Sequence, residues 1–286
     1  MDKAAHESFL AQVDATDKAT LHSECQAGAR AFWHANPGKG LDLMMNADEF
    51  RVEVATRLCM AEEGDRWCPL CDAVHDSRAH HARMCCAGGD RVQRHNAVRN
   101  FFFRFLATAG LRPELEKPGL LLPSRPDEAG QEARRPADVY VPAWSSGSPA
   151  AFDFAVTAPQ QALYREAAAL EPLAAATAYT SRKKLFMNTA EVCRTQGVEF
   201  LPMVVETPGA WAPEATKALK KVAAAAAATT GRTEEQLWQE LLQGLAVCVR
   251  RSNARAVLRR KADPPSPQAK EREAAMTELE AAAAAR

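Results

Sequence analysis

The sequence predicts an α/β protein, in which a mixed β-sheet is flanked by helices and preceded by a helical region and a small Cys/His-rich segment. Three observations predict this arrangement. Stretches with the apolar spacing of helices alternate with short runs rich in Val and Phe. Several cysteines cluster in one stretch. No apolar run approaches the roughly 20 residues that a membrane span needs. The predicted units are an N-terminal helical region (1–62), a Cys/His-rich knot (63–90), an α/β domain (91–261) and a Pro/Ala-rich tail (262–286) that we expect to be disordered.

The bulk composition is that of an ordinary globular protein. Hydrophobic residues make up 47% and charged residues 25% of the 286 positions, close to globular averages. The formal net charge is +0, so affinity for an anionic polymer must come from a local cluster of charge. The N-terminus resembles no secretion signal, and the cysteines in a chain of this length then argue against a disulfide framework. We expect an intracellular protein that has no membrane partner.

Helical periodicity is clearest in three places before residue 110. Apolar positions follow helical spacing around 9–13 and over 50–58, with a break at 35–40 between them. A longer amphipathic stretch covers 91–109 and ends at Gly110, the residue type expected just after a helix. The first 60 residues are therefore predicted to be helical, and a long helix follows the Cys/His-rich knot.

The second half of the chain alternates between extended and helical patterns. A Thr-x-x-Gln sequence at Thr233 predicts the start of the last helix. The predicted elements, in order, are an extended segment (111–122), two strands around Asp138 and Asp153, a helix (159–197) kinked at Pro172, a strand (198–207), and helical residues 213–261 interrupted at 229–233.

The Cys/His-rich knot has the ligand spacing of a zinc site. Cys-x-x-Cys supplies two ligands from one tight turn, and a His and a Cys about one helical turn apart supply the other two. The predicted ligands are Cys68, Cys71, His81 and Cys85. His80 and Cys86 can replace the second pair by a slide of one residue, and a metal-free exposed loop is the alternative. A zinc ion here would be structural, because the segment has too few apolar residues to fold by itself.

The helix after the knot carries the strongest local charge imbalance. Residues 78–104 include six arginines but only one acidic residue, Asp90. Arginine matches phosphate oxygens with two parallel hydrogen bonds, so a stripe of this kind suits a nucleic-acid backbone. The alternative is a solvated helix face opposite an apolar one. The basic residues are Arg78, Arg83, Arg91, Arg94, Arg99 and Arg104, of which we expect Arg91, Arg94 and Arg99 to contact phosphates.

Two aspartates on neighbouring strands are candidate Mg²⁺ ligands. Asp138 and Asp153 are predicted to hold the ion, and Glu116 in the preceding segment is a possible third ligand. Nucleases of this chemistry often place a lysine two residues after the second acid, where Ala155 stands. The nearest downstream lysines are 183 and 184, so the charge would come from the following helix.

A hairpin closing at residues 146 and 147 predicts the geometry of these acids. It would set Asp138 opposite Ala155 and diagonal to Asp153 on the same face. A slip of one residue would send the two side chains to opposite faces. The alternative is a pair of aspartates that face solvent and bind nothing.

Six motifs occur in order along the chain. They are Cys-x-x-Cys, His-Ala-x-x-Cys, Gly-Gly-Asp-Arg-x-x-Arg-His-Asn, Pro-Glu-Leu-Glu-Lys-Pro-Gly, Arg-Arg-Pro-Ala-Asp-Val and Phe-Asp-x-Ala-Val-Thr. This ordered set closely resembles the restriction-like endonuclease region at the C-terminal end of reverse transcriptase proteins of site-specific non-LTR retrotransposons. The similarity covers most of residues 28–261. The chain departs from the family pattern in having Pro-Ala-Asp for Pro-Asp, and it contains no Tyr-x-Asp-Asp polymerase motif.

The resemblance implies a Cys-Cys-His-Cys zinc knuckle (63–90) followed by a PD-(D/E)xK endonuclease core (91–261). It implies that Arg94 and His95 lie near the DNA or the active site. The implied catalytic residues are Asp138, Asp153 and the displaced Lys183, with Glu116 and Glu206 as supporting acids.

The expected function is that of a retroelement-derived, Mg²⁺-dependent endonuclease that nicks duplex DNA and contains structural Zn²⁺. The alternative is a catalytically inactive zinc-knuckle remnant that binds nucleic acid. The expected partner is DNA, with the element's RNA or a reverse transcriptase acting in trans as further candidates, and the expected location is the nucleus.

Overall fold

The structure is a computed structural model with a four-stranded mixed sheet at its centre. Strand β4 pairs antiparallel with β3 and with β5, whereas β5 and β6 are parallel. The strands are β3 (Glu114–Leu115), β4 (Val139–Val141), β5 (Ala150–Thr157) and β6 (Glu199–Glu206). The structure describes residues 3–36, 38, 43–61, 64–71, 73–121, 136–144, 147–262 and 271.

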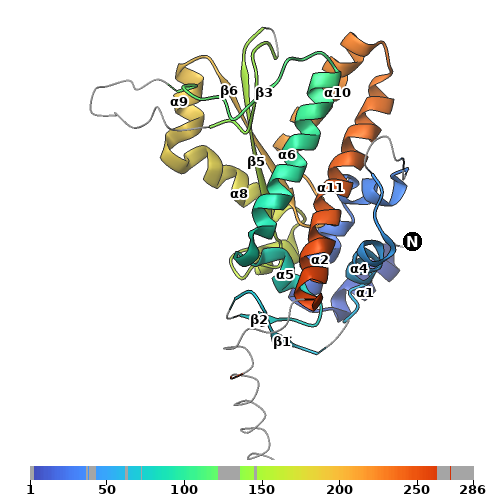
Figure 1. The fold of residues 1–286 in the computed structure, drawn as a ribbon. Coiled ribbons are helices and arrows are strands. Elements are labelled where there is room, and N and C mark those ends of the chain that lie inside the picture. Colours follow the sequence, from blue (N-terminus) through green and yellow to red (C-terminus); the bar gives the residue numbers. More distant parts are fainter. Residues whose placement is uncertain are drawn as a thin grey trace, which may run out of the picture.

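Helices cover both faces of this sheet (Figure 1). One side carries α6 (Asp90–Thr108), α10 (Pro213–Thr230) and α11 (Glu234–Ala262), and the other carries α8 (Ala174–Leu185) and α9 (Thr189–Thr195). A short helix, α7 (Arg165–Leu170), precedes α8. The predicted α/β class with a mixed sheet flanked by helices is confirmed.

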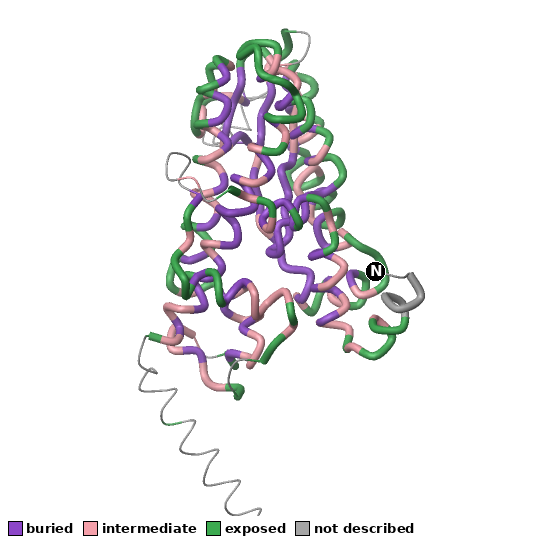
Figure 2. Tube along the Cα trace, turned by 90° about the vertical axis from the view of Figure 1, so that its right-hand side faces the viewer, coloured by how far each residue is buried: buried purple, intermediate pink, exposed green. Residues whose placement is uncertain are grey.

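Strand β5 is the centre of the core, because helices pack against both of its faces. Phe152 and Phe154 pack around Phe102 of α6, with ring centroids 5.1 Å apart in each pair. On the opposite face Ala151 packs in a cluster with Cys193 of α9. Burial on both faces favours the almost continuous apolar sequence of β5. Figure 2 shows buried residues along the central strands and the long helices.

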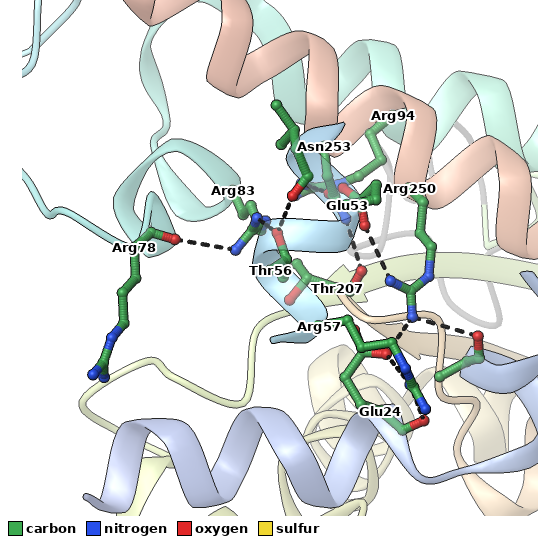
Figure 3. Close-up of polar contacts among 12 residues, drawn as sticks. Glu24, Glu53, Thr56, Arg57, Arg78, Arg83, Arg94, Thr207, Arg250 and Asn253 are labelled. Carbon is green, nitrogen blue, oxygen red and sulfur yellow. Dashed lines mark hydrogen bonds and ion pairs between the residues drawn. The ribbon is translucent and has the colours of Figure 1, made fainter. Parts of the chain in front are cut away.

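Part of the N-terminal helical region packs against α11. The helices of this region are α1 (Lys3–Gln12), α2 (Ala15–Glu24), α3 (Ala27–Arg30), the 3₁₀ helix η1 (Ala31–His34) and α4 (Ala47–Arg57). Of these, α3, η1 and α4 contact α11, whereas α2 packs mainly against α7. Arg250 of α11 is fully buried and pairs with Glu24 of α2 at 2.7 Å and with Glu53 of α4 at 3.1 Å (Figure 3). One guanidinium therefore joins three helices that lie far apart in the sequence.

Several predicted elements differ in detail from the observed ones. The predicted helix over 159–197 is three helices, and Pro172 lies in the break between α7 and α8, because proline cannot continue the hydrogen-bond ladder. Over its described residues, 111–121, the expected extended segment contains only the two-residue strand β3. The predicted cap at Thr233 is confirmed, since its hydroxyl accepts the Gln236 N–H at 3.3 Å.

Two sequence-based expectations lie partly or wholly outside the described residues. In the expected tail, only 262 and 271 are described. The hairpin turn at 146–147 is described only at its second residue. Over the part of the chain that is described, no helix combines the length and the apolarity needed to cross a membrane.

Candidate functional site

The Cys/His-rich knot folds into a compact metal-binding cluster. Strands β1 (Arg66–Trp67) and β2 (Val74–His75) form a hairpin, and helix α5 (His80–Met84) follows. The Sγ of Cys71 lies 3.3 Å from Nε2 of His81 and 3.6 Å from Sγ of Cys85. The ligand atoms of Cys68, Cys71, His81 and Cys85 all lie within 4.8 Å of one another.

This cluster fits a tetrahedral zinc ion. Bonds of about 2.3 Å to sulfur and about 2.0 Å to nitrogen place neighbouring ligand atoms roughly 3.5 to 3.8 Å apart, close to the separations observed. The predicted set of three cysteines and one histidine is therefore brought together as a group that can hold a metal ion. The ion, when bound, would link the β1–β2 hairpin to α5.

The one-residue alternatives are not part of the cluster. Cys86 is exposed, and its Sγ accepts a hydrogen bond from Arg91 at 2.9 Å. Both ring nitrogens of His80 are buried and have no hydrogen-bond partner among the described residues. Burial lowers the pKa of His80 to about 4, so its ring is neutral at physiological pH. The structure thus selects His81 and Cys85 over His80 and Cys86.

Arg260 of α11 connects the metal cluster to α6. Its guanidinium hydrogen-bonds the Cys85 thiol and donates to Oδ2 of Asp90 at 2.7 Å. Asp90 is the first residue of α6, and a carboxylate there also suits the positive end of the helix dipole. The cluster is consequently fastened to the start of the helix that carries the predicted nucleic-acid contacts.

A second group of polar residues gathers at one edge of β5. Strand β4 begins at Val139, which pairs with Phe152. No described strand therefore pairs with the same edge of β5 after Phe152, and the N–H and carbonyl of Phe154 bond to side chains instead. Its N–H donates to Oδ2 of Asp138 at 2.6 Å, and its carbonyl accepts from Nζ of Lys183 at 3.1 Å.

Each aspartate at this edge faces a basic side chain. Nζ of Lys183, from α8, lies 2.6 Å from Oδ2 of Asp153. Nε2 of His95, from α6, lies 3.2 Å from Oδ1 of Asp138. Two acids, one amine and one imidazole therefore converge from the residue that precedes β4 and from β5, α8 and α6.

The two carboxylates have different electrostatic environments. Burial raises the pKa of Asp153 to about 6, with the nearby Asp138 charge adding to the rise and Lys183 opposing it. Burial also opposes ionisation of Asp138, but hydrogen bonds from His95 and from the Phe154 N–H outweigh it and lower its pKa. Such divergence between neighbouring acids is common at sites where ions or substrates bind.

Two clefts meet at Lys183. One of about 380 Å³ lies between α6 and α8 and is lined by Arg91, His95 and Phe154. The other, of about 460 Å³, is lined by Asp153 on the side of α8 and α9. Lys183 therefore borders open space on two sides, and Asp153 borders the second cleft.

The predicted hairpin geometry needs correction. The symmetric turn predicted Asp138 opposite Ala155, but the observed register of Val139 with Phe152 sets it level with Asp153. The turn is displaced by one residue toward the N-terminus, which shifts the cross-strand pairing by two. An even shift keeps alternation intact, so the two acids stay neighbours although the predicted pairing was wrong.

Glu116 contacts the site through its main chain. Its N–H donates to the carbonyl of Asp138 at 3.0 Å, and its carboxylate pairs with Arg99. Glu206, the other expected supporting acid, is buried and accepts the Ala176 N–H at the start of α8 at 3.1 Å. Both acids therefore have a structural partner.

The predicted phosphate-contacting stripe divides into an outer and an inner part. Arg91 is exposed, whereas Arg94 is only 3% exposed. Arg94 donates to Oδ1 of Asn253 at 2.8 Å (Figure 3), so its guanidinium is held inside the protein, and the expected phosphate contact stays a prediction. Arg99 is mostly buried against Glu116. The helical spacing placed all three on one stripe, but the packing of α11 turned Arg94 inward.

Asn253 is a site residue to which the sequence assigned no role. It holds Arg94, and its Nδ2 donates to the carbonyl of Thr207 at 2.7 Å. It therefore fixes α6 and the end of β6 relative to α11. The sequence pattern that could have predicted its burial is its helical spacing from the apolar residues of α11, which places a polar side chain on the buried face.

No protein-family model matches the chain. No curated protein sequence matches it either.

Proposed function

We propose that the chain is a zinc-containing, divalent-metal-dependent endonuclease that nicks duplex DNA. The observation that supports this most is the convergence of Asp138, Asp153 and Lys183 on Phe154 at the edge of β5. Two carboxylates and an amine close together suit phosphodiester hydrolysis, and two of these groups, Asp153 and Lys183, line an open cleft. A PD-(D/E)xK core with its lysine moved to a helix accounts for this arrangement and for the ordered motifs.

In this proposal Asp138 and Asp153 would hold a Mg²⁺ ion, which polarises the scissile phosphate and makes a bound water more acidic. Lys183 then neutralises charge that develops on the phosphate or orients the attacking water. A water oxygen bonds to phosphorus while the bond from phosphorus to one bridging oxygen breaks. The water gives up one proton, and the leaving oxygen takes up one, so the step balances overall. His95 positions the carboxylate of Asp138 through the hydrogen bond to its Oδ1.

The zinc knuckle and α6 would bind the DNA backbone. Arg91 lies exposed beside the cleft that contains His95 and Lys183, and phosphate contacts of this kind set the register of a protein on a duplex. The knuckle, held by Cys68, Cys71, His81 and Cys85, would keep the start of α6 in place through Arg260. We further propose that the protein acts in the nucleus, where an element's RNA or a reverse transcriptase could act beside it.

A second candidate is a nucleic-acid-binding remnant that cleaves nothing. It is favoured by the ion pair between Glu116 and Arg99, because this pair engages the carboxylate expected to be the third metal ligand.

Supercoiled plasmid separates the two candidates. The wild type should convert it to open circles with Mg²⁺, and Asp138→Ala or Asp153→Ala should abolish this. Asp48→Ala, which removes an exposed acid on α4 that pairs only with Arg51 in the described structure, should nick like the wild type. Plasmid binding without nicking by the wild type would support the remnant and sink the enzyme.

A further inference from the structure

Three consecutive exposed apolar side chains border the candidate site. Leu185 ends α8, and Phe186 and Met187 follow it; the three side chains are 76%, 65% and 54% exposed. Phe186 and Met187 line the same cleft as Asp153 and Lys183. Runs of exposed apolar residues are uncommon on a monomeric surface, and they indicate a binding surface.

The turn that carries these residues holds a defined shape. In the 3₁₀ turn η6 (Phe186–Asn188), Met187 and Asn188 have φ values of 48° and 57°. Two successive non-glycine residues in the left-handed region persist only where the surroundings hold them, often at ligand contacts. The buried Thr189 does so here, because its hydroxyl donates to the carbonyl of Phe186 at 2.6 Å.

Basic residues directly precede the apolar run. Arg182 is exposed and lines the cleft, and Lys183 reaches Asp153. The surface therefore changes from cationic to apolar within one turn. Duplex DNA offers a partner for each kind of side chain. Its phosphates attract cations, and the faces of two adjacent base pairs accept an apolar side chain when the pairs separate.

We infer that Phe186 inserts between adjacent base pairs of duplex DNA beside the phosphate at Asp153 and Lys183, flanked by Leu185 and Met187. Arg182 contacts a neighbouring phosphate. The inference rests on the proposed function, because it takes DNA as the ligand. Insertion of an apolar side chain partly unstacks the step and kinks the duplex, which would expose the scissile phosphate on the widened side.

Insertion unwinds DNA, so a closed circular plasmid measures it without knowledge of the target sequence. The full chain is bound to relaxed plasmid without Mg²⁺, a topoisomerase that needs no metal is added, and the linking number is read on a gel. The wild type should lower the linking number in proportion to the protein bound. Phe186→Ser should lose most of this change and weaken plasmid binding by about fivefold or more.

Leu170→Ser is the matched control, because Leu170 is 85% exposed on α7 and does not line the cleft. It should leave the linking-number change and the binding intact. Circular dichroism of each variant shows that the fold is retained.

Plasmid bound by the wild type without a change in linking number would overturn the inference, as would an unchanged effect in Phe186→Ser. If Phe186→Ser instead splits a dimer seen by light scattering and leaves the unwinding intact, the surface joins two copies of the chain and the inference is wrong. A wild type that unwinds plasmid but never nicks it with Mg²⁺ would contradict the proposed activity and support the insertion. A protein that binds no plasmid would contradict both.

Discussion

Phe154 organises the candidate site through its main chain. Strand β4 begins only opposite Phe152, so the N–H and carbonyl of Phe154 do not bond to β4. They bond instead to the side chains of Asp138 and Lys183. Its side chain meanwhile packs against Phe102. The positions of the acid and the amine are thereby fixed by the core, as a preorganised site requires.

Lys183→Ala tests the role of the amine. Removing a preorganised cation that faces a developing charge should reduce nicking by about 100-fold or more. Lys184→Ala is the control, since Lys184 is next along the helix and pairs with Glu214 instead. Initial nicking rates on supercoiled plasmid measure both, and equal rates for the two variants would contradict a role for Lys183.

Asn253→Ala tests the buried contact that holds α6. It leaves the guanidinium of Arg94 without its acceptor in the interior, which should lower the free energy of unfolding by about 2 to 3 kcal/mol. The exposed Asn100 on α6 provides the control Asn100→Ala. Urea unfolding followed by fluorescence measures both, and a loss below about 0.5 kcal/mol for Asn253→Ala would show that the contact contributes little.

At the scale of elements, the sequence predicted best those features in which metal binding or helix packing fixes the spacing of residues. The zinc-type spacing predicted the cluster correctly, and the apolar period predicted α6 to within one residue at each end. The breaks among α7, α8 and α9 were less predictable, because only Pro172 marks one of them. The inward turn of Arg94 depends on contact with α11, which no local pattern contains.

The cysteines at 85 and 86 give a direct test of the metal cluster. Cys85→Ser should lose zinc and lower the melting temperature, because a structural zinc ion contributes several kcal/mol or more to local folding. Cys86→Ser should retain both. Zinc content and thermal unfolding are the measurements, and Co²⁺ substitution reports the thiolate ligands by absorption. Equal behaviour of the two variants would contradict the assigned ligand set.

At the scale of the whole molecule, α11 is the element that the other parts share. Its buried polar residues reach the N-terminal helices through Arg250, α6 through Asn253, and the metal cluster through Arg260. The sequence predicted a helix here but not these contacts, since pairings between residues about 200 positions apart depend on the tertiary fold. The proposed division at residues 62 and 90 stays a prediction.

Arg250→Met tests this shared role. It leaves Glu24 and Glu53 buried, with Arg250 no longer there to balance their charge, and should cost about 3 to 5 kcal/mol of stability. Arg255→Met is the control on the same helix, because Arg255 is exposed and pairs with Glu49 at 2.7 Å. Chemical denaturation of both proteins gives the difference. A cost for Arg250→Met no greater than that of the control would mean that the buried ion pairs of Arg250 add no more stability than an exposed pair.

Binding of Mn²⁺ as a substitute for Mg²⁺ tests most directly whether Asp138 and Asp153 form one metal site. Electron paramagnetic resonance during a Mn²⁺ titration of the zinc-loaded protein should show saturable binding that Asp138→Asn and Asp153→Asn each abolish and Asp48→Asn leaves unchanged. Absence of saturable binding, or the same binding in all three variants, would contradict a shared ion at the edge of β5.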